Sequence, residues 1–485
     1  MSAKGTDPEK AKSGFGSPDH PTHRYVGFAL LLAWHYNLWF LHDSFVGAQL
    51  LDDCVTQSWL IALVAAGISF LAIPIVLNRK RHLSDIPWLH WTATGFAVGS
   101  TAILTLLAFT FPTDLISYGL AVIVGVTNAI LWIMWGELYS RTQTTFQMGY
   151  IATTVGFVMF VSSLICYLLP SGVSSVLISL MPLGAAILYA HGENAAKDLP
   201  YPTLLPKSTA HRAFKPMIVV CDTTFVAAAA CYFLVAIIPW DTFAYGDSAF
   251  TFGSMGGALL LLLIGGICAL TKERLNIYRI FPWLIVLAII AFAVFLMGNN
   301  QYNVAFYLIL AVVAVFEILL VMYFGVLGVK GYVPVAFAFG FSGAFIRLGI
   351  ALGNSIALAY EAQPEFAIVA TKPTSLIFVC ILAAIVIPLV RQEYNITQLM
   401  APPSSESTQE QRIKELAAEF SLSARETEIV TLIARGFTTD NVAKKLYISP
   451  YTVNTHIRHV YEKVGIHKRS ELIDYINRHG NDKDE

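Results

Sequence analysis

Apolar runs follow one another along the chain up to residue 390, and each is about as long as a bilayer is thick. A hydrocarbon core of about 30 Å requires roughly 20 apolar residues of helix. Twelve such runs fall at residues 25–41, 58–77, 88–109, 115–139, 150–169, 173–190, 217–239, 249–270, 280–297, 302–326, 333–359 and 373–390. The polar stretch 191–216 divides them into six and six. The pattern therefore predicts an all-α, polytopic membrane domain over residues 25–390, with halves at 25–190 and 217–390.

Residues 1–24 precede the first run and are polar, with many Gly, Ser, Pro and Lys residues. They contain no short apolar segment followed by the small residues of a signal-peptide cleavage site. We expect this segment to be a disordered cytoplasmic tail.

After residue 390 the apolar runs give way to short amphipathic helices. A Pro- and Ser-rich stretch at 401–407 is typical of a linker, and Thr408 with Gln411 forms a capping box for a short helix at 408–420. Residues 391–420 are therefore interpreted as linker and short helix. The stretch 421–479 is interpreted as a separate four-helix domain.

The helices of this last domain are bounded by recognisable capping residues. Ser423 and Glu426 form a capping box at the start of the first, and Gly436 suits its C-terminus. A second helix is expected at 439–446. Ser449 is a good N-cap for a third helix, because Pro450 follows at the first helical position. A fourth is expected near 470–477.

The distribution of basic residues predicts the orientation of the membrane domain. With the N-terminus placed in the cytoplasm, the inner segments hold almost all Lys and Arg, and the outer loops hold only Lys372. The outer loops are otherwise acidic or uncharged, with Asp43, Asp52, Asp53, Asp114, Asp241, Asp247, Glu361 and Glu365. Because cytoplasmic loops retain basic residues, both termini are predicted to be cytoplasmic.

Composition agrees with a membrane protein and adds little about partners. The chain is 56% hydrophobic and 13% charged, whereas soluble domains are about 25% charged. Its 31 basic and 32 acidic residues balance, so net charge favours no class of ligand. The six cysteines show no spacing typical of a disulfide framework or a zinc site. The aromatic residues, 13% of the chain, are expected mostly toward lipid and in the interfacial belts.

Several polar side chains fall at membrane depth and are candidates for a ligand pocket. They are His35, Asn37, Asn128, Glu137, Asp222, Glu317 and Arg347. Ionisable groups inside a bilayer cost at least about 2.5–3.5 kcal/mol each and usually face a cavity or a partner. By helical rise, Glu317 and Arg347 lie at similar depth on adjacent helices and could meet.

Two interpretations of these residues stay open. One is a ligand or proton site between the halves; the other is a buried ion pair that fixes helix packing, with Glu137 extending beside Arg141 toward the interface. His35 and His42 share a helix face, but a third ligand is missing, so neither a metal site nor a cofactor is expected.

Six runs, a central cytoplasmic loop and six more runs resemble the major facilitator superfamily, which is built from two six-helix halves. The resemblance covers about residues 25–390 and rests on architecture. Members of that superfamily usually carry a Gly/Asp/Arg-rich signature after the second helix. Here residues 78–85 keep the charge but lack the glycines, which argues against active transport.

The third helix of the C-terminal domain has two different faces. Its core positions are Val453, Ile457, Val460 and Val464, and Asn454, Thr455 and Arg458 lie on the opposite side. Two helices, a tight turn, and polar residues at the exposed start of the second helix suit the DNA major groove. Asn and Arg can pair there with adenine and guanine edges. Residues 422–478 also carry nine basic against six acidic side chains.

This domain closely resembles the helix-turn-helix domain of the LuxR family. The similarity runs through residues 422–426, 433–436, 442–446, 448–457, 461–466 and 469–472. It implies that Asn454, Thr455 and Arg458 face the bases. It also implies that Thr452, Lys463 and Arg469 lie near phosphates and that the fourth helix mediates dimerisation. Family members often have Lys where Asn454 stands, so no base preference is carried over.

These features together predict a bacterial one-component transcription regulator in the inner (cytoplasmic) membrane. A small molecule would bind between the halves and change how the tethered DNA-binding domains pair. The expected partners are double-stranded DNA, the lipid bilayer, an unknown small molecule and a second copy of the chain, with RNA polymerase as a further candidate.

Two alternatives remain at this point: a major-facilitator-like transporter with a fused regulatory DNA-binding domain, and a membrane scaffold whose C-terminal domain binds protein. An enzyme is not expected, because the sequence has no phosphate-binding glycine loop, nucleophile elbow or metal cluster.

Overall fold

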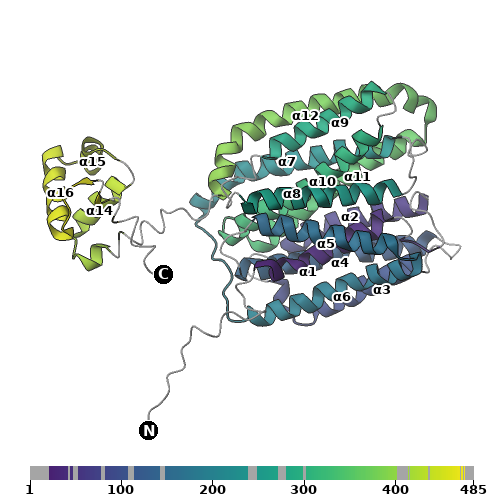
Figure 1. The fold of residues 1–485 in the computed structure, drawn as a ribbon, viewed down its shortest axis with the longest axis horizontal. Coiled ribbons are helices and arrows are strands. Elements are labelled where there is room, and N and C mark those ends of the chain that lie inside the picture. Colours follow the sequence, from purple (N-terminus) through teal and green to yellow (C-terminus); the bar gives the residue numbers. More distant parts are fainter. Residues whose placement is uncertain are drawn as a thin grey trace, which may run out of the picture. The chain divides into compact units, whose positions relative to one another are not determined.

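The computed structural model divides the chain into two compact units, Met1–Met400 and Ala401–Glu485 (Figure 1). The residues that it describes are 21–41, 44–46, 53–77, 82–106, 114–142, 148–238, 248–270, 280–298, 302–400, 413, 416–434, 437–469, 471–472 and 475. The predicted tail therefore lies outside the described residues, apart from the start of the first helix.

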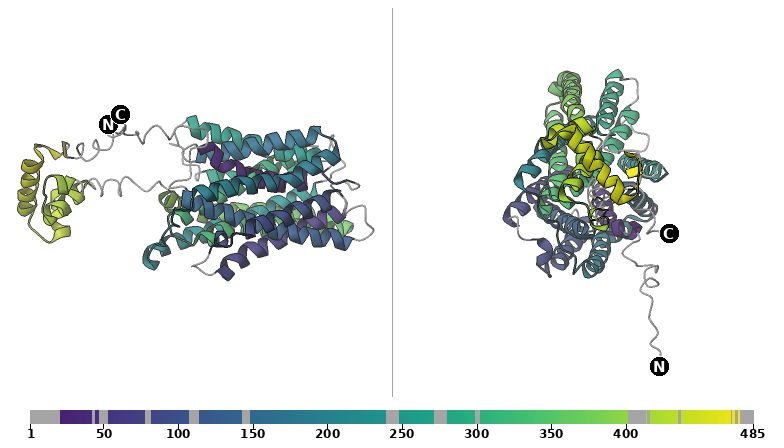
Figure 2. Two further views of the ribbon diagram at one scale, coloured as in Figure 1. Left: turned by 90° about the horizontal axis from the view of Figure 1, so that it is seen from below. Right: turned by 90° about the vertical axis from the view of Figure 1, so that its left-hand side faces the viewer.

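The first unit is a bundle of long helices that run side by side (Figures 1 and 2). Its α-helices are α1 (Pro21–Phe40), α2 (Asp53–Leu77), α3 (Leu89–Leu106), α4 (Asp114–Thr142), α5 (Met148–Leu168), α6 (Ser171–Ala195), α7 (Lys207–Ile237), α8 (Ser248–Leu270), α9 (Phe281–Met297), α10 (Tyr302–Val329), α11 (Val335–Glu361) and α12 (Pro364–Met400). A short 3-10 helix, η2 (Leu83–Asp85), lies between α2 and α3. Within the described segments, nine helices are long and apolar enough to cross a membrane. The predicted all-α membrane class is confirmed, and the number of twelve spans stays a prediction.

Two helices extend well beyond their predicted apolar runs. α7 begins at Lys207 and α12 continues to Met400. Because α6 also continues to Ala195, the central connection is reduced to residues 196–206. Lys372, the one basic residue predicted in an outer loop, lies inside α12. Hydropathy detects only the part of a helix that matches the hydrocarbon core. A helix that continues past this layer ends in polar residues that the pattern assigns to loops.

The two halves, α1–α6 and α7–α12, pack against each other chiefly through α5 on α8 and α2 on α11. Small residues allow this close approach, as is common between membrane helices. A Cβ added to Gly156 of α5 would lie 2.6 Å from the carbonyl oxygen of Ala258 on α8.

Many aromatic side chains lie in the interior of the bundle, so the expectation that aromatic residues mostly face lipid is wrong for the described residues. The bundle's largest fully buried side chains include Trp34, Trp132, Tyr25, Tyr232, Tyr323, Phe28, Phe70, Phe233 and Phe292. Trp34 Nε1 donates to Thr101 Oγ1 at 3.0 Å, and Trp132 Nε1 donates to Ser342 Oγ at 3.3 Å. A buried indole needs such a partner. Large rings fill the space between the helices. A hydropathy pattern does not distinguish a ring that faces another helix from one that faces lipid.

The second unit is a small helical domain with its own apolar core. Its described helices are α14 (Ala424–Ala434), α15 (Thr439–Leu446) and α16 (Pro450–Val464). The core is formed by Ile413, Leu416, Ile429, Val430, Leu432, Ile433, Val442, Ala443, Val453, Val460, Val464 and Leu472.

Local hydrogen bonds in this unit follow the predicted caps. The backbone N–H of Ser423 donates to Glu426 Oε2 at 2.7 Å, and the N–H of Glu426 donates to Ser423 Oγ at 3.2 Å. The capping box is thus present. Ser449 Oγ accepts from the N–H of Thr452 at 3.0 Å, with Pro450 opening α16 as predicted. Gly436, the Thr408–Gln411 capping box and most of the predicted fourth helix lie outside the described residues.

Candidate functional sites

α15 and α16 form a helix-turn-helix whose second helix has one free face. The turn passes through Tyr447 with a φ of 53°. On α16, Val453 is fully buried, whereas Asn454 and Arg458 are exposed. Arg458 Nε lies 3.9 Å from Glu462 Oε1 on the surface, which is a weak interaction for exposed groups. Arg458 and Asn454 thus lie on an exposed face, whereas Thr455 is half-buried and donates its hydroxyl to Tyr451 O at 3.0 Å. The base contacts of all three stay predictions.

Two tyrosines beside this face were not predicted as functional residues. Tyr447 and Tyr451 are 95% and 82% exposed, although large aromatic side chains usually bury much of their surface. They flank the start of α16, where a ring with a hydroxyl could pack against a sugar and reach a phosphate. Their position beside the turn was visible in the sequence, but their exposure depends on how α15 and α16 pack.

Lys463 and Arg469, expected near phosphates, are engaged within the domain. Lys463 Nζ donates to Glu426 Oε2 at 2.7 Å and to Ser421 O at 3.2 Å. Arg469 Nη2 donates to two backbone carbonyls: Ile433 O in the last turn of α14 at 3.2 Å, and Phe437 O after that helix at 3.0 Å. These contacts indicate structural positions for both residues, and their phosphate contacts stay predictions.

The pair with Lys463 also explains the acidity of Glu426. Burial raises the pKa of this carboxyl, but the hydrogen bonds from Lys463 and Ser423 outweigh burial and bring the pKa to about 2. Glu426 therefore stays charged under all ordinary conditions and joins the capping box of α14 to the end of α16.

In the membrane unit, Glu317 and Arg347 meet as the depth of their positions predicted. Arg347 Nη2 on α11 lies 3.2 Å from Glu317 Oε1 on α10, and both side chains are almost fully buried. Tyr36 of α1 donates its hydroxyl to the second oxygen, Glu317 Oε2, at 2.8 Å. Because α1 belongs to the first half and α10 and α11 to the second, this network crosses the interface of the halves.

Arg347 also contacts the first half through aromatic rings. Its guanidinium carbon lies 4.7 Å from the ring centre of Trp132 on α4 and 5.0 Å from that of Phe70 on α2. A desolvated guanidinium over such rings gains about 2 kcal/mol from cation–π attraction. The charge of Arg347 is thus shared between a carboxylate of its own half and two rings of the other half.

Among the described residues, the other predicted pocket residues form no hydrogen bond or ion pair with this network. Asn37 is used between helices, since its amide donates to Ser162 Oγ at 3.0 Å and accepts from Ser163 Oγ at 2.6 Å, both on α5. Asp222 is exposed on α7. His35 is buried beside Tyr36, with their ring centres 6.3 Å apart, and its Nδ1 has no hydrogen-bond partner among the described residues.

Glu137 has a different structural role from the one expected, because it does not pair with Arg141. It is fully buried and accepts from the backbone N–H groups of Leu83 and Ser84, both at 3.0 Å. Arg141 instead pairs with Glu193 of α6. Glu137 therefore holds η2, the connection between α2 and α3, against α4.

Tyr201, in the central connection, contacts the same end of the bundle. Its hydroxyl hydrogen-bonds Ser84 Oγ, its ring stacks on His82 with centres 3.5 Å apart, and Arg141 lies over it at 4.8 Å. Further along the connection, Leu205 N donates to Gly331 O between α10 and α11 at 2.9 Å. The central connection thus ties both halves together at this end.

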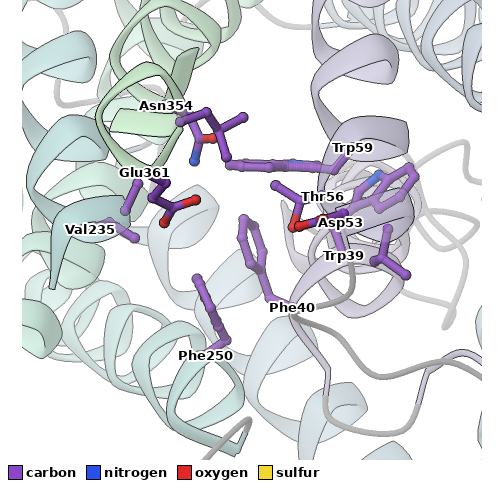
Figure 3. A pocket seen from close by; sticks show the side chains of 12 residues that line it. Trp39, Phe40, Asp53, Thr56, Trp59, Val235, Phe250, Asn354 and Glu361 are labelled. Atoms are coloured by element: carbon purple, nitrogen blue, oxygen red, sulfur yellow. The ribbon is translucent and has the colours of Figure 1, made fainter. Parts of the chain in front are cut away.

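At the opposite end a cavity of about 130 Å³ lies between the halves (Figure 3). It is lined from α1, α2, α7, α8 and α11 by Trp39, Phe40, Asp53, Val55, Thr56, Trp59, Val235, Ala236, Phe250, Asn354, Leu358 and Glu361. The sequence interpretation missed this site. Asn354 was detectable as a polar residue inside an apolar run, whereas Asp53 and Glu361 resembled ordinary loop acids.

Ring contacts lead from the cavity to the buried ion pair. Phe40 in the cavity wall lies 5.7 Å from Tyr36, ring centre to ring centre, and Tyr36 hydrogen-bonds Glu317. On the other side, Trp59 lies 5.6 Å from Tyr232 of α7. A ligand that moves the side chains of the cavity would therefore also move side chains at the interface between the two halves.

Known proteins are similar to the two units separately. Residues 420–476 match the family described as bacterial regulatory proteins, luxR family. An HTH-type transcriptional regulator of Mycobacterium tuberculosis is 42% identical over 60 residues, 12% of this chain and 7% of that protein. The oxygen regulatory protein NreC of Staphylococcus aureus is 43% identical over 54 residues, 11% of this chain and 25% of that protein. The chain thus spans a quarter or less of these curated relatives, and the similarity concerns the DNA-binding domain.

The solved structures match the membrane unit instead. The peptide transporter POT superposes with a TM-score of 0.51 at 12% identity, over 80% of this chain and 97% of that protein. The major facilitator superfamily transporter FucP, in its outward conformation, superposes with a TM-score of 0.46 at 11% identity, over 78% of this chain and 99% of that protein. At such identities only the fold is comparable. The chain is a fusion: a membrane domain whose fold is similar to that of a solved peptide transporter, followed at the C-terminus by a helix-turn-helix domain that matches the luxR family of bacterial regulatory proteins.

Proposed function

We propose that this protein is a membrane-embedded one-component transcription regulator, which senses a small molecule through its membrane domain and binds promoter DNA through α15 and α16. The observation that carries the proposal is the free face of α16, with Asn454 and Arg458 exposed, on the same chain as a transporter-like bundle. The distribution of basic residues would place both termini in the cytoplasm, where DNA is accessible, and the bundle in the inner membrane.

A sensing role is supported by the different construction of the two ends of the bundle. The end that carries Glu137 and Tyr201 is tied across both halves, and by the basic residues it would face the cytoplasm. The other end carries the cavity. A ligand shifts a conformational equilibrium only by binding one state better than another. A site lined by both halves gives the ligand such a preference, because relative motion of the halves changes the site.

The ion pair of Glu317 and Arg347 is the proposed sensor of that motion. It holds α1, α10 and α11 together through Tyr36 and sets Arg347 on rings of α2 and α4. Buried charges tolerate few arrangements, since each arrangement must keep them paired. Such a network favours two distinct states of the bundle over a continuous range.

DNA binding is tested by mapping genome occupancy of the tagged full-length protein beside Arg458→Ala in the same cells. We expect discrete promoter peaks that weaken or vanish in the variant, because one good base contact contributes about 1–3 kcal/mol. Glu462→Gln is the matched control: it removes the acid beside Arg458 and keeps the arginine, so it should retain the peaks.

The outcome that would contradict DNA binding is a specific one. If both full-length proteins insert correctly and give no peaks, the segment from Thr408 onward is tested on genomic DNA fragments. Failure of this segment to bind would remove the regulator proposal and favour a scaffold or transporter.

Transport with a fused regulator is the second candidate function, favoured by the transporter-like fold and by a cavity between the halves. It predicts flux of a bound compound into vesicles, abolished by Glu317→Ala or Arg347→Ala. The sensor predicts binding without flux. Flux at a rate comparable to binding would make transport the primary activity.

A further inference from the structure

The cavity between the halves has a chemistry that selects its ligand. We propose that it binds a compact organic cation that also carries a hydroxyl or carbonyl oxygen. This inference rests on the proposed function only in calling the cation a signal; binding itself is argued from the cavity. Figure 3 shows the Glu361 carboxylate on one side of the space and Asp53 on the other, with the ring of Phe40 between them and that of Phe250 below Glu361.

Charge is the first reason for a cation. The described lining residues include two carboxylates, Asp53 and Glu361, and neither Lys nor Arg. Neither carboxylate has an ion-pair partner within the described part of the chain. Asp53 begins α2, where the helix dipole favours an acid, but Glu361 ends α11, where the dipole disfavours one. Both carboxylates are exposed, so they are accessible to a cation from solvent, and helix stability does not account for Glu361.

Aromatic faces are the second reason. Phe40 and Phe250 are stacked, with ring centres 5.7 Å apart and planes at 20°, and Trp59 stands at 73° to Phe40 at 5.6 Å. Rings at such different inclinations form part of a cage. Cages of this kind attract cations through the ring quadrupole and accept methyl or methylene groups on the same surface.

Unsatisfied polar atoms indicate what else the ligand must carry. Trp39 Nε1, Trp59 Nε1 and Asn354 Oδ1 are buried in the cavity lining, and none has a hydrogen-bond partner among the described residues. Buried polar groups without hydrogen-bond partners are rare and costly, so we expect a ligand to supply a partner for each of these atoms. Two donors and one acceptor suit a hydroxyl group, or a carbonyl together with an N–H. A bare alkylammonium could donate to Asn354 Oδ1, but it has no acceptor and would leave both indole N–H groups unmet.

The surroundings of the cavity agree with this assignment. By the basic residues, this end of the bundle would face outward, and the outer segments carry eight acids and a single Lys372. A surface of one sign raises the local concentration of the opposite charge. The ligand would therefore be an amine or quaternary ammonium compound that reaches the cell from outside.

The test uses the purified full-length protein in detergent and two pairs of probes that differ in charge. Choline is compared with 3,3-dimethylbutan-1-ol, in which carbon replaces the nitrogen, and tyramine with the alcohol tyrosol. Binding is measured by tryptophan fluorescence and by the shift of the thermal unfolding midpoint. We expect at least one cation to bind at least about tenfold more tightly than its neutral partner, a difference of about 1.4 kcal/mol.

Variants distinguish cation binding in the cavity from cation binding elsewhere on the protein surface. Glu361→Gln should weaken cation binding about tenfold or more, whereas Glu365→Gln, an exposed acid outside the lining, should leave it unchanged. Trp59→Phe keeps a ring and removes the indole N–H, so it should weaken choline and 3,3-dimethylbutan-1-ol alike through the lost hydroxyl contact. The unfolding midpoint without ligand verifies that each variant is folded.

Three results would overturn the inference: neutral probes that bind as tightly as cations, no binding of either cation up to about 10 mM, or unchanged binding by folded Glu361→Gln. Promoter occupancy is measured separately and tells the two proposals apart. Cation binding that never alters occupancy would refute sensing and keep the site. Occupancy that depends on Arg458 without cation binding would refute only the ligand class.

Discussion

Each unit of the protein contains a buried glutamate paired with a cation, and the two pairs are built differently. In the membrane unit, the side chains of Glu317 and Arg347 are 7% and 2% exposed. In the DNA-binding unit, Glu426 is 5% exposed while Lys463 is 39% exposed. The first pair lies entirely away from water, so each partner depends on the other. In the second pair, the lysine side chain is partly exposed to water.

The hydrogen-bond partners of the two carboxylates differ as well. Glu426 accepts from the backbone of Ser423 and from Lys463, within one capping box and its neighbouring helix end. Glu317 accepts from Tyr36, 281 residues away. The DNA-binding unit thus satisfies a buried charge with local structure, and the membrane unit does so with residues from both halves. This contrast predicts which pair is harder to change.

The largest effect is expected for Glu317→Ala, which leaves Arg347 buried and without its carboxylate. Breaking a buried pair on one side costs about 3–5 kcal/mol. The unfolding midpoint of the full-length protein in detergent should fall strongly. Adding Arg347→Met should recover much of the loss, because it removes the unpaired charge. If the double variant were no more stable than Glu317→Ala, the pair would not be the source of the effect.

A smaller loss is expected for Lys463→Met in the DNA-binding unit. The buried carboxylate of Glu426 loses its charged donor but keeps its bond from Ser423 and gains water through the opened side. A loss of about 1–3 kcal/mol is expected for such an incompletely satisfied group. Urea unfolding of residues 401–485 measures it. Lys468→Met, at an exposed position on the same unit, is the control and should change little.

Acid should weaken the same pair. The folded pKa of Glu426 is about 2, below its ordinary value of 4.5, so its carboxylate contributes stability that is complete above pH 4.5. This stability is lost as the pH falls toward 2, where the folded form is protonated. Glu426→Gln should flatten this part of the pH dependence of urea unfolding. Glu428→Gln, whose partner Arg425 is on the surface, should keep it.

The smallest effect is expected for Ser449→Ala, which removes the N-cap of α16. The lost hydrogen bond to Thr452 should cost about 1 kcal/mol, seen as a shift of the urea midpoint of residues 401–485 without a change in slope. Thr439→Ala, one position after the N-cap Thr438 of α15, is the matched control. Equal losses in both variants would show that the effect does not come from capping.

Local chemistry made the DNA-binding unit predictable from sequence. The capping box of Ser423 and Glu426, the N-cap Ser449 and the free face with Asn454 and Arg458 all depend on residues within a few positions of each other. Such interactions are set by helix geometry alone. In the membrane unit, the apolar runs and the similar depth of Glu317 and Arg347 were predictable for the same reason, since helical rise converts sequence distance into depth.

Only the tertiary structure decided the partners of these residues. It brought Tyr36 to Glu317, turned Glu137 to the backbone of η2 and away from Arg141, and left Asp222 exposed on α7. It also assembled the cavity from five helices, with Asn354 and Glu361 facing rings of the other half. A run of apolar residues shows that a helix lies in an apolar environment. It does not show whether that environment is lipid or the protein interior. Which faces meet depends on how small residues and large rings fit between helices, which only packing can settle.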